Sequence, residues 1–262
     1  MFRWVFAFAL ALSAPVSVVA ADTAPRAPIM TIPAELRSRL HEVVLSNDPS
    51  QAQRLQRLIR FVFDAEGLGM SYQEDATYSV EQAYATRKAN CLTFTFLFLA
   101  LAREAGLDAY PQEIGETLAW HQDDDTIYRN NHVNVGVRIG RREYTVDVIG
   151  DSVIALKRPA TVSDRRLLAH YYNNLSISQL SQDQMAPALQ NMSIALEFDP
   201  DYATHWSNAG VLYLRNGDPV AAERAYERAL ALDPVNAGAL FNMAGLAHRN
   251  GDRRREAEFQ KR

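Results

Sequence analysis

Residues 87–106 have the sequence RKANCLTFTFLFLALAREAG, in which one cysteine precedes a long apolar run. From Leu92 onward apolar side chains occur almost all round a helical projection, which is typical of a central, buried helix. Gly106 is its natural C-terminal stop. Cys91 therefore lies at a predicted helix N-terminus, where the helix dipole, free backbone N–H groups and the two basic residues just before it favour a thiolate.

Cys91 is the single cysteine of the 262-residue chain. It has no partner for an internal disulfide, so it is either buried and inert or present for its reactivity. Free cysteine also packs well as a small hydrophobe, and Leu92 beside it is compatible with a core position. The local sequence alone leaves both interpretations open.

Strand patterns follow this helix at 109–114, 132–139 and 143–148. In the last two, valine and isoleucine alternate with polar residues, as expected for strands with one apolar face. Gly140 and Arg141 between them predict a tight hairpin turn.

The hairpin has one self-consistent register. If Ile139 pairs with Arg142, Asn134 lies opposite Asp147, and His132 lies one diagonal from Asp147 on the same face, with about 7–8 Å between the backbones. A carboxylate at that distance is able to reach and orient an imidazole. For the hairpin considered alone, the simpler alternative is a solvent-exposed polar face.

The order of these features resembles one superfamily. A cysteine that opens a buried helix, a histidine on a strand and an aspartate on the next strand are typical of transglutaminase-like, papain-like thiol hydrolases. The resemblance extends from about Gln51 to Asp147. Two sequence details depart from it: Ala89 stands where the family usually has glycine, and no aromatic residue clearly follows His132.

The resemblance implies an α+β fold, with a helical N-terminal part and a buried Cys-bearing helix packed on an antiparallel sheet. Helices are predicted before the cysteine at 33–44 and 51–66. By position, Cys91 would be the nucleophile, His132 its base and Asp147 the residue that orients the histidine. A Cys-His-Asp triad of this kind would make the chain a cysteine protease, amidase or acyl-transferase that acts on protein or peptide amides.

Three further residues are weighed as site groups. Tyr78 and Gln82 lie upstream, where a second oxyanion donor is needed, although Gln82 also fits a capping box with Ser79. His121 is an alternative base. The six histidines form no HExxH motif and a lone cysteine does not build a thiolate zinc site, so no metal is predicted, and no cofactor either.

The C-terminal third repeats with a period of 34 residues. Aromatic or apolar, small and proline positions recur at this step: Tyr172, Trp206 and Leu240; Leu175, Ala209 and Met243; Ala188 and Ala222; Pro200 and Pro234. The pattern resembles tetratricopeptide (TPR) repeats at 169–202, 203–236 and, in part, 237–262. It implies an α-solenoid of helix pairs whose concave face binds a protein partner. The alternative to an enzyme is therefore a catalytically inactive scaffold that binds proteins or peptides.

The net charge and the N-terminal segment indicate which kinds of partner and which compartment to expect. The net charge of -4 and the absence of a polybasic stretch argue against a nucleic-acid partner. Residues 1–21 have the pattern of a signal peptide cleaved after Ala21, the alternative being an uncleaved membrane anchor. We therefore expect a periplasmic or secreted protein without membrane insertion after cleavage. The expected order is the signal peptide, a linker at 22–31, the transglutaminase-like domain at 32–165 and the repeats at 166–262.

Overall fold

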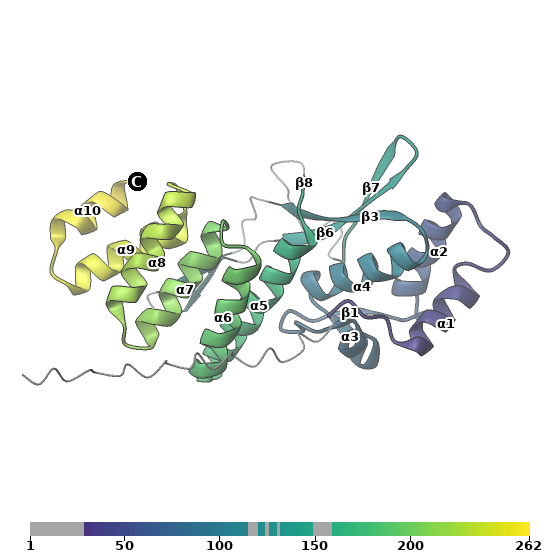
Figure 1. The fold of residues 1–262 in the computed structure, drawn as a ribbon, viewed down its shortest axis with the longest axis horizontal. Coiled ribbons are helices and arrows are strands. Elements are labelled where there is room, and N and C mark those ends of the chain that lie inside the picture. Colours follow the sequence, from purple (N-terminus) through teal and green to yellow (C-terminus); the bar gives the residue numbers. More distant parts are fainter. Residues whose placement is uncertain (1–28, 115–119, 124–125, 130–131, 149–158) are drawn as a thin grey trace, which may run out of the picture.

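A computed structural model describes residues 29–114, 120–123, 126–129, 132–148 and 159–262. It is a mixed α/β part joined side by side to a run of helix pairs, and it confirms the predicted fold class (Figure 1). The predicted signal peptide and most of the predicted linker lie outside the described residues. Within those residues, none of the helices combines the length and apolar character needed to cross a bilayer.

Two helices build the N-terminal layer, as predicted. Helix α1 spans Ala34–Val43 and helix α2 spans Gln51–Phe63, with Ser50 and Gln53 forming a capping box at the start of α2. Their buried leucines pack into the core around helix α4. Helix α2 ends three residues before the predicted end, because the backbone becomes extended at Asp64.

Helix α4 (Cys91–Glu104) is the centre of the α/β part. Every residue from Leu92 to Ala102 is buried, which confirms the prediction from its all-round apolar sequence. Gly106 follows with φ +73, the left-handed conformation that ends the chain's helical course. Before it come strand β1 (Ser71–Tyr72), helix α3 (Val80–Thr86) and strand β2 (Lys88–Ala89), with β1 parallel to β2.

A four-stranded antiparallel sheet covers α4, in the order β7-β6-β3-β8. Its strands are β3 (Asp108–Ile114), β6 (His132–Ile139), β7 (Arg142–Val146) and β8 (Ala160–Thr161). Strands β4 (Trp120–Asp123) and β5 (Thr126–Arg129) form a separate pair.

The predicted hairpin register is confirmed. Ile139 pairs with Arg142 and Arg138 with Glu143, around a turn in which Gly140 has φ +60. The solvent-exposed alternative holds only near the turn, where Arg138, Glu143 and Thr145 are exposed. At the other end of the hairpin His132 is only 6% exposed and Asn134 only 2%. Both faces of β6 are covered from His132 to Val137, so His132 and Asn134 are shielded from water.

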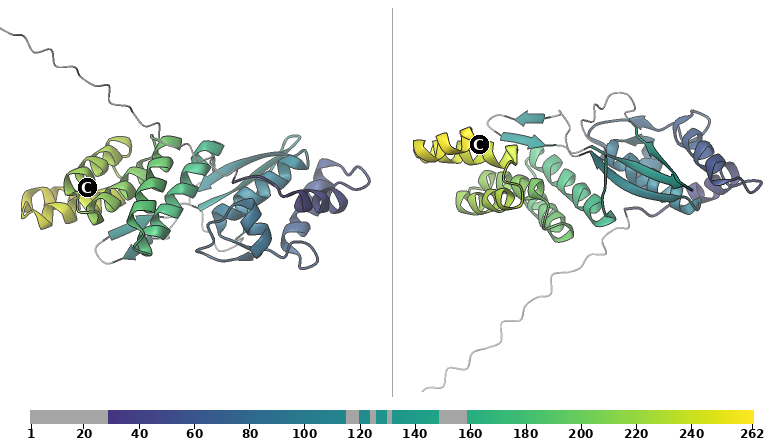
Figure 2. Two further views of the ribbon diagram at one scale, coloured as in Figure 1. Left: turned by 60° about the horizontal axis from the view of Figure 1, so that its bottom comes forward. Right: turned by 90° about the horizontal axis from the view of Figure 1, so that it is seen from above.

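The helix pairs follow as predicted for a repeat array, and Figure 2 shows them stacked beyond the sheet. The first pair is α5 (Asp164–Ser181) with α6 (Met185–Phe198), the second is α7 (Ala203–Arg215) with α8 (Pro219–Leu232), and the third is α9 (Ala237–Arg249) with α10 (Arg253–Lys261).

Small residues set the distance between paired helices. A Cβ atom added to Gly210 would lie 2.3 Å from the ring of Tyr226, so only glycine fits there. Ser176 occupies the corresponding place in the first repeat, and its hydroxyl donates to the carbonyl of Ala188 at 2.7 Å. In the first repeat a hydrogen bond from serine thus replaces the close approach at glycine.

The N-terminal segment packs on the α/β part earlier than predicted. Ile29 is 6% exposed and its carbonyl accepts from the N–H of Val80 at 2.8 Å. Packing within the described residues thus already includes Ile29, three positions before the predicted boundary, because the apolar Ile29 and Ile32 both reach the core.

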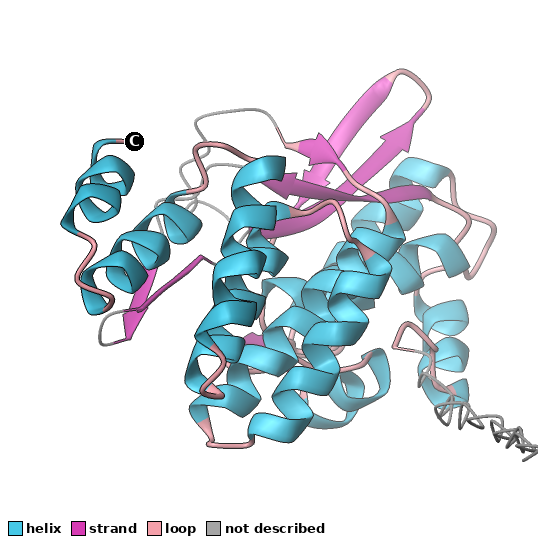
Figure 3. Ribbon diagram, turned by 60° about the vertical axis from the view of Figure 1, so that its left-hand side comes forward, coloured by secondary structure: helices cyan, strands magenta, loops and turns pink. Residues whose placement is uncertain are grey.

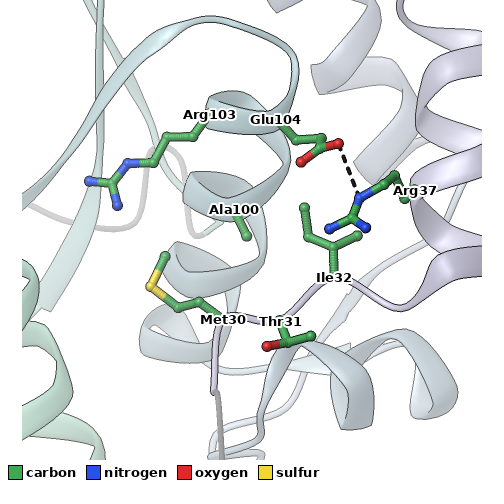
Figure 4. A pocket seen from close by; sticks show the side chains of 7 residues that line it. All are labelled: Met30, Thr31, Ile32, Arg37, Ala100, Arg103 and Glu104. Atoms are coloured by element: carbon green, nitrogen blue, oxygen red, sulfur yellow. Dashed lines mark ion pairs between the residues drawn. The ribbon is translucent and has the colours of Figure 1, made fainter.

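The same segment borders a pocket of about 480 Å³ at the C-terminal half of α4, away from Cys91. Figure 4 shows Met30, Thr31 and Ile32 along one side of it, with Arg37 paired to Glu104 at 3.1 Å. Arg103 points the other way and binds Asp164 of α5 at 2.6 Å. Both arginines are thus engaged in structural ion pairs.

The α/β part and the repeats share one hydrophobic core. Helix α5 contacts both α4 and β3, and the rings of Phe96 and Tyr171 meet edge to face with centroids 5.8 Å apart. Seen from the side of the repeats, α5 stands directly against the sheet and the central helix (Figure 3). The first repeat is therefore also a wall of the α/β part.

Candidate active site

Cys91 is the first residue of α4 and is partly exposed. Asn90 caps the helix by accepting from the N–H of Thr93 at 2.9 Å, while its own amide donates to the Thr77 hydroxyl at 2.9 Å. The backbone N–H of Cys91 has no partner within the helix, as at every helix start. It is therefore suited to donate to an oxygen that develops negative charge beside the sulfur.

Thr95 ties the cysteine to the strand that carries the histidine. Its hydroxyl lies 2.8 Å from the carbonyl oxygen of Cys91 and 3.3 Å from that of Val133. Thr95 thus lies between the backbone of Cys91 and the backbone next to His132.

His132, Asp147 and Asn134 form a buried hydrogen-bonded group. His132 Nε2 lies 2.6 Å from Asp147 Oδ2, and Asn134 Nδ2 donates to the same oxygen at 3.2 Å. The side chains of His132 and Asp147 are 7% and 15% exposed. Because a carboxylate accepts the Nε2–H, Nδ1 is the ring nitrogen left for proton exchange with a substrate or thiol.

The third predicted residue, Cys91, is the other partner of this imidazole. Burial lowers the pKa of His132, but hydrogen bonds with Asp147 and Cys91, and the negative charges of both, raise it from 6.5 to about 9. The histidine is therefore cationic at neutral pH and lies between a carboxylate and the sulfur. The structure brings all three predicted residues together.

Tyr72 is a neighbour of the site that the sequence did not suggest. Strand β1 pairs Tyr72 with Ala89, two residues before the cysteine. Burial raises the pKa of its phenol, as do the charges of Cys91 and Glu74. The small Ala89 is completely buried beside it, so the position where glycine is usual is filled without leaving space. Only the tertiary pairing of β1 with β2 reveals this tyrosine.

The upstream candidates for an oxyanion donor both contribute to local structure. Gln82 forms the predicted capping box with Ser79, its side-chain oxygen accepting from the Ser79 N–H at 2.9 Å. The backbone N–H of Tyr78 donates to the Thr93 hydroxyl at 2.7 Å, which anchors that loop on α4. A role of either side chain as the second oxyanion donor stays a prediction.

His121 and His41 are the other histidines of the α/β part. His121 lies in β4, whose side chains are outside the described part of the structure. His41 is exposed and pairs with Glu104 at 3.3 Å. Among the described residues, no three histidine, cysteine or acidic side chains are grouped so as to hold a metal ion.

Comparison with known families gives the same two parts in the same order. The profile of the transglutaminase-like superfamily matches residues 38–141, which include Cys91 and His132 and stop before Asp147. A tetratricopeptide repeat profile matches residues 206–234. The chain carries a transglutaminase-like superfamily domain followed by a tetratricopeptide repeat. The match to the first profile confirms the resemblance drawn from the order of its residues.

Curated relatives resemble the chain over shorter segments. It is 40% identical over 76 residues to the Hsp70-Hsp90 organizing protein of Triticum aestivum, a match that covers 29% of this chain and 13% of that protein. It is 32% identical over 73 residues to the tetratricopeptide repeat domain-containing protein PYG7, chloroplastic, of Arabidopsis thaliana (28% and 24%). It is 31% identical over 115 residues to the photosystem I assembly protein Ycf3 of Cyanophora paradoxa (43% and 65%).

By their names, the first of these relatives organises Hsp70 and Hsp90, the second contains a tetratricopeptide repeat domain and the third assists photosystem I assembly. Together with the two domains of this chain, they suggest a role in protein interaction. The matches span 13%, 24% and 65% of the three relatives.

Proposed function

We propose that this protein is a cysteine hydrolase or acyl-transferase that acts on protein or peptide amides. The observation that carries the proposal is a cationic His132 held at 2.6 Å by Asp147, with the sulfur of Cys91 as its second partner. An imidazolium and a helix N-terminus beside the same sulfur both favour a thiolate nucleophile.

The first half-reaction forms a thioester. The thiolate of Cys91 attacks the amide carbonyl carbon, and the carbonyl oxygen takes the negative charge near the backbone N–H of Cys91. The carbon–nitrogen bond then breaks as His132 gives its Nδ1 proton to the leaving amine. Asp147 keeps the ring oriented throughout and stabilises its cationic form.

The second half-reaction regenerates the thiolate. Neutral His132 takes a proton from an incoming water or amine, whose oxygen or nitrogen attacks the thioester, and the sulfur leaves as thiolate. Water gives hydrolysis, and an amine gives acyl transfer. Both outcomes use the same three side chains.

Alkylation of Cys91 by iodoacetamide tests the proposal. We expect Cys91 to be labelled in the folded protein, because it is partly exposed and lies beside the imidazole of His132. His132→Gln should remove this reactivity, whereas His41→Gln, which changes an exposed histidine on α1, should not. A thiol that reacts only after unfolding, or equally in both variants, would overturn the enzyme proposal.

A protein-binding role without catalysis is the second candidate, and the repeat-containing relatives favour it. Helices α7 and α9 are the first helices of their repeats and line up beside each other. Phe241 of α9 is 39% exposed, and Val220 of α8 is 60% exposed. If the first helices bind a protein, Phe241→Ser should weaken capture of a partner identified by mass spectrometry, and Val220→Ser should not. Equal capture by both variants would contradict binding through Phe241.

Export is the last part of the proposal. It rests on the signal-peptide pattern of residues 1–21. N-terminal sequencing of protein from the periplasm or medium should begin near Asp22, and a retained Met1 in the membrane fraction would contradict it.

A further inference from the structure

A second buried group of ionisable side chains lies where the repeats meet the sheet, which we call the junction cluster. It joins Glu113 of β3 to side chains of the first two repeats: Arg166 and His170 of α5, Asp199 after α6, and Tyr202 and His205 at the start of α7. The proposed reaction uses none of them.

Glu113 is held by the repeats from several sides. The hydroxyl of Tyr202 donates to its Oε1 at 2.5 Å. Arg166 Nη1 lies 3.7 Å from its Oε2, and His170 Nε2 lies 3.8 Å from Oε1. The side chain of Glu113 is 7% exposed, so its charge is neutralised by these groups rather than by water.

The groups that hold Glu113 are themselves fixed. Arg166 Nε donates to Asp199 Oδ2 at 2.6 Å, and its guanidinium lies 4.6 Å from the centre of the Tyr202 ring. His170 Nδ1 and His205 Nε2 are 3.1 Å apart. The cluster is therefore a rigid anchor point on strand β3.

That anchor point lies next to the segment of β6 that carries His132. In the sheet, Glu113 pairs with Val133, and Ile114 pairs with His132. The Thr95 hydroxyl lies 2.8 Å from the carbonyl oxygen of Cys91 and 3.3 Å from that of Val133. Side-chain contacts and strand pairing thus connect the repeats, through Glu113 and β6, to the backbone beside His132 and to Cys91.

We propose that Glu113 is a positioning residue, by which the first two repeats hold β3 and β6 so that His132 stays between Asp147 and Cys91. This inference rests on the proposed thiol chemistry and gives the repeats a second role beside partner binding. Without the anchor, the His132 end of β6 would be held in the sheet only by its pairing with β3. The imidazole would then spend less time at its 2.6 Å contact.

The test measures the His132 pKa directly, by NMR titration of protein with ¹³C-labelled histidine, using His132→Gln to assign its signal. In the unaltered protein it should be about 9. Glu113→Gln and, more mildly, Tyr202→Phe should lower it, the former by at least about one unit, equal to a tenfold weaker preference for the cation. Asp108→Asn on the same strand, where the exposed carboxylate pairs with Arg138, should leave it unchanged.

The outcomes separate the inference from the proposed function. An unshifted His132 pKa in both folded variants would overturn the positioning role, and so would an equal shift in Asp108→Asn. Circular dichroism establishes that each variant is folded, and Tyr202→Phe keeps the ring contacts if Glu113→Gln does not fold. If the His132 pKa falls as expected but Cys91 of the unaltered protein resists alkylation, the positioning stands and the catalytic proposal fails.

Discussion

Two buried histidine sites in this protein are tuned in opposite directions. At the candidate active site, Asp147 and Cys91 are both partners of His132, and its pKa rises to about 9. In the junction cluster, burial and the charge of His170 hold the pKa of His205 well below its usual value of 6.5. The two rings differ in their partners: a carboxylate and a thiol surround one, while another imidazole faces the other.

The difference shows which of the two sites is suited to chemistry. A buried imidazole that stays cationic is able to keep a thiolate beside it and to give up a proton to a leaving amine. A buried imidazole that stays neutral is a donor and acceptor for packing, and it suits a structural contact. The same residue type therefore serves two purposes, set by the groups within hydrogen-bond reach.

The largest expected effect is a loss of unfolding free energy at alkaline pH, caused by deprotonation of His132. A raised histidine pKa contributes stability that is fully present below pH 6.5 and is lost as the pH rises through about 9. The shift corresponds to at most about 3 kcal/mol. Urea unfolding at pH 7 and pH 10 should show a larger loss of unfolding free energy in the unaltered protein than in His132→Gln. Equal losses would mean that His132 is not coupled to its partners.

A smaller effect is expected on the acid side, from the junction cluster. Because the pKa of His205 is lowered, the unfolded state binds the proton first, and stability falls as the pH drops below 6.5. Glu113, whose pKa is lowered by its contacts with His170, Tyr202 and Arg166 despite burial, adds to this loss below pH 4.5. His205→Gln should flatten the decline in melting temperature between pH 7 and pH 5. An unchanged slope would contradict this assignment.

The smallest effect should come from Tyr72, the neighbour of the candidate active site. Tyr72→Phe removes a hydroxyl that feels the charge of Cys91 but leaves the ring and strand pairing in place. We expect alkylation of Cys91 at pH 6.5 to slow a few-fold, about the effect of losing one hydrogen bond. Tyr144→Phe on β7 is the matched control, and a rate that changes equally in both would exclude a specific role.

Much of the fold follows from short-range pattern. The all-round apolar sequence of α4, the alternation in β6 and β7 and the 34-residue spacing each correspond to one element or unit of the structure. The hairpin register followed from Gly140 and the alternating valines, and it placed Asp147 within reach of His132. The catalytic role of these residues with Cys91 stays a prediction.

The missed features all depend on contacts between distant segments. Tyr72 lies near the candidate active site because β1 pairs with β2, and a two-residue strand leaves no periodic pattern to detect. Glu113 and His205 appear as ordinary polar residues in the sequence, since 92 positions separate them and only the docking of the repeats buries them. Local sequence predicts which face of an element is apolar, but not which element covers its polar residues.

The shared wall between α4 and α5 has a consequence for how the molecule comes apart. Phe96 and Tyr171 belong to the same apolar cluster, so a cut between the domain and the first repeat would expose the back of the helix that bears Cys91. Neither half is then an autonomous folding unit, and heat should melt the α/β part and the first repeat in one cooperative transition. Strand β5 also contacts α7 and α9, so the later repeats are attached to the α/β part at a second place.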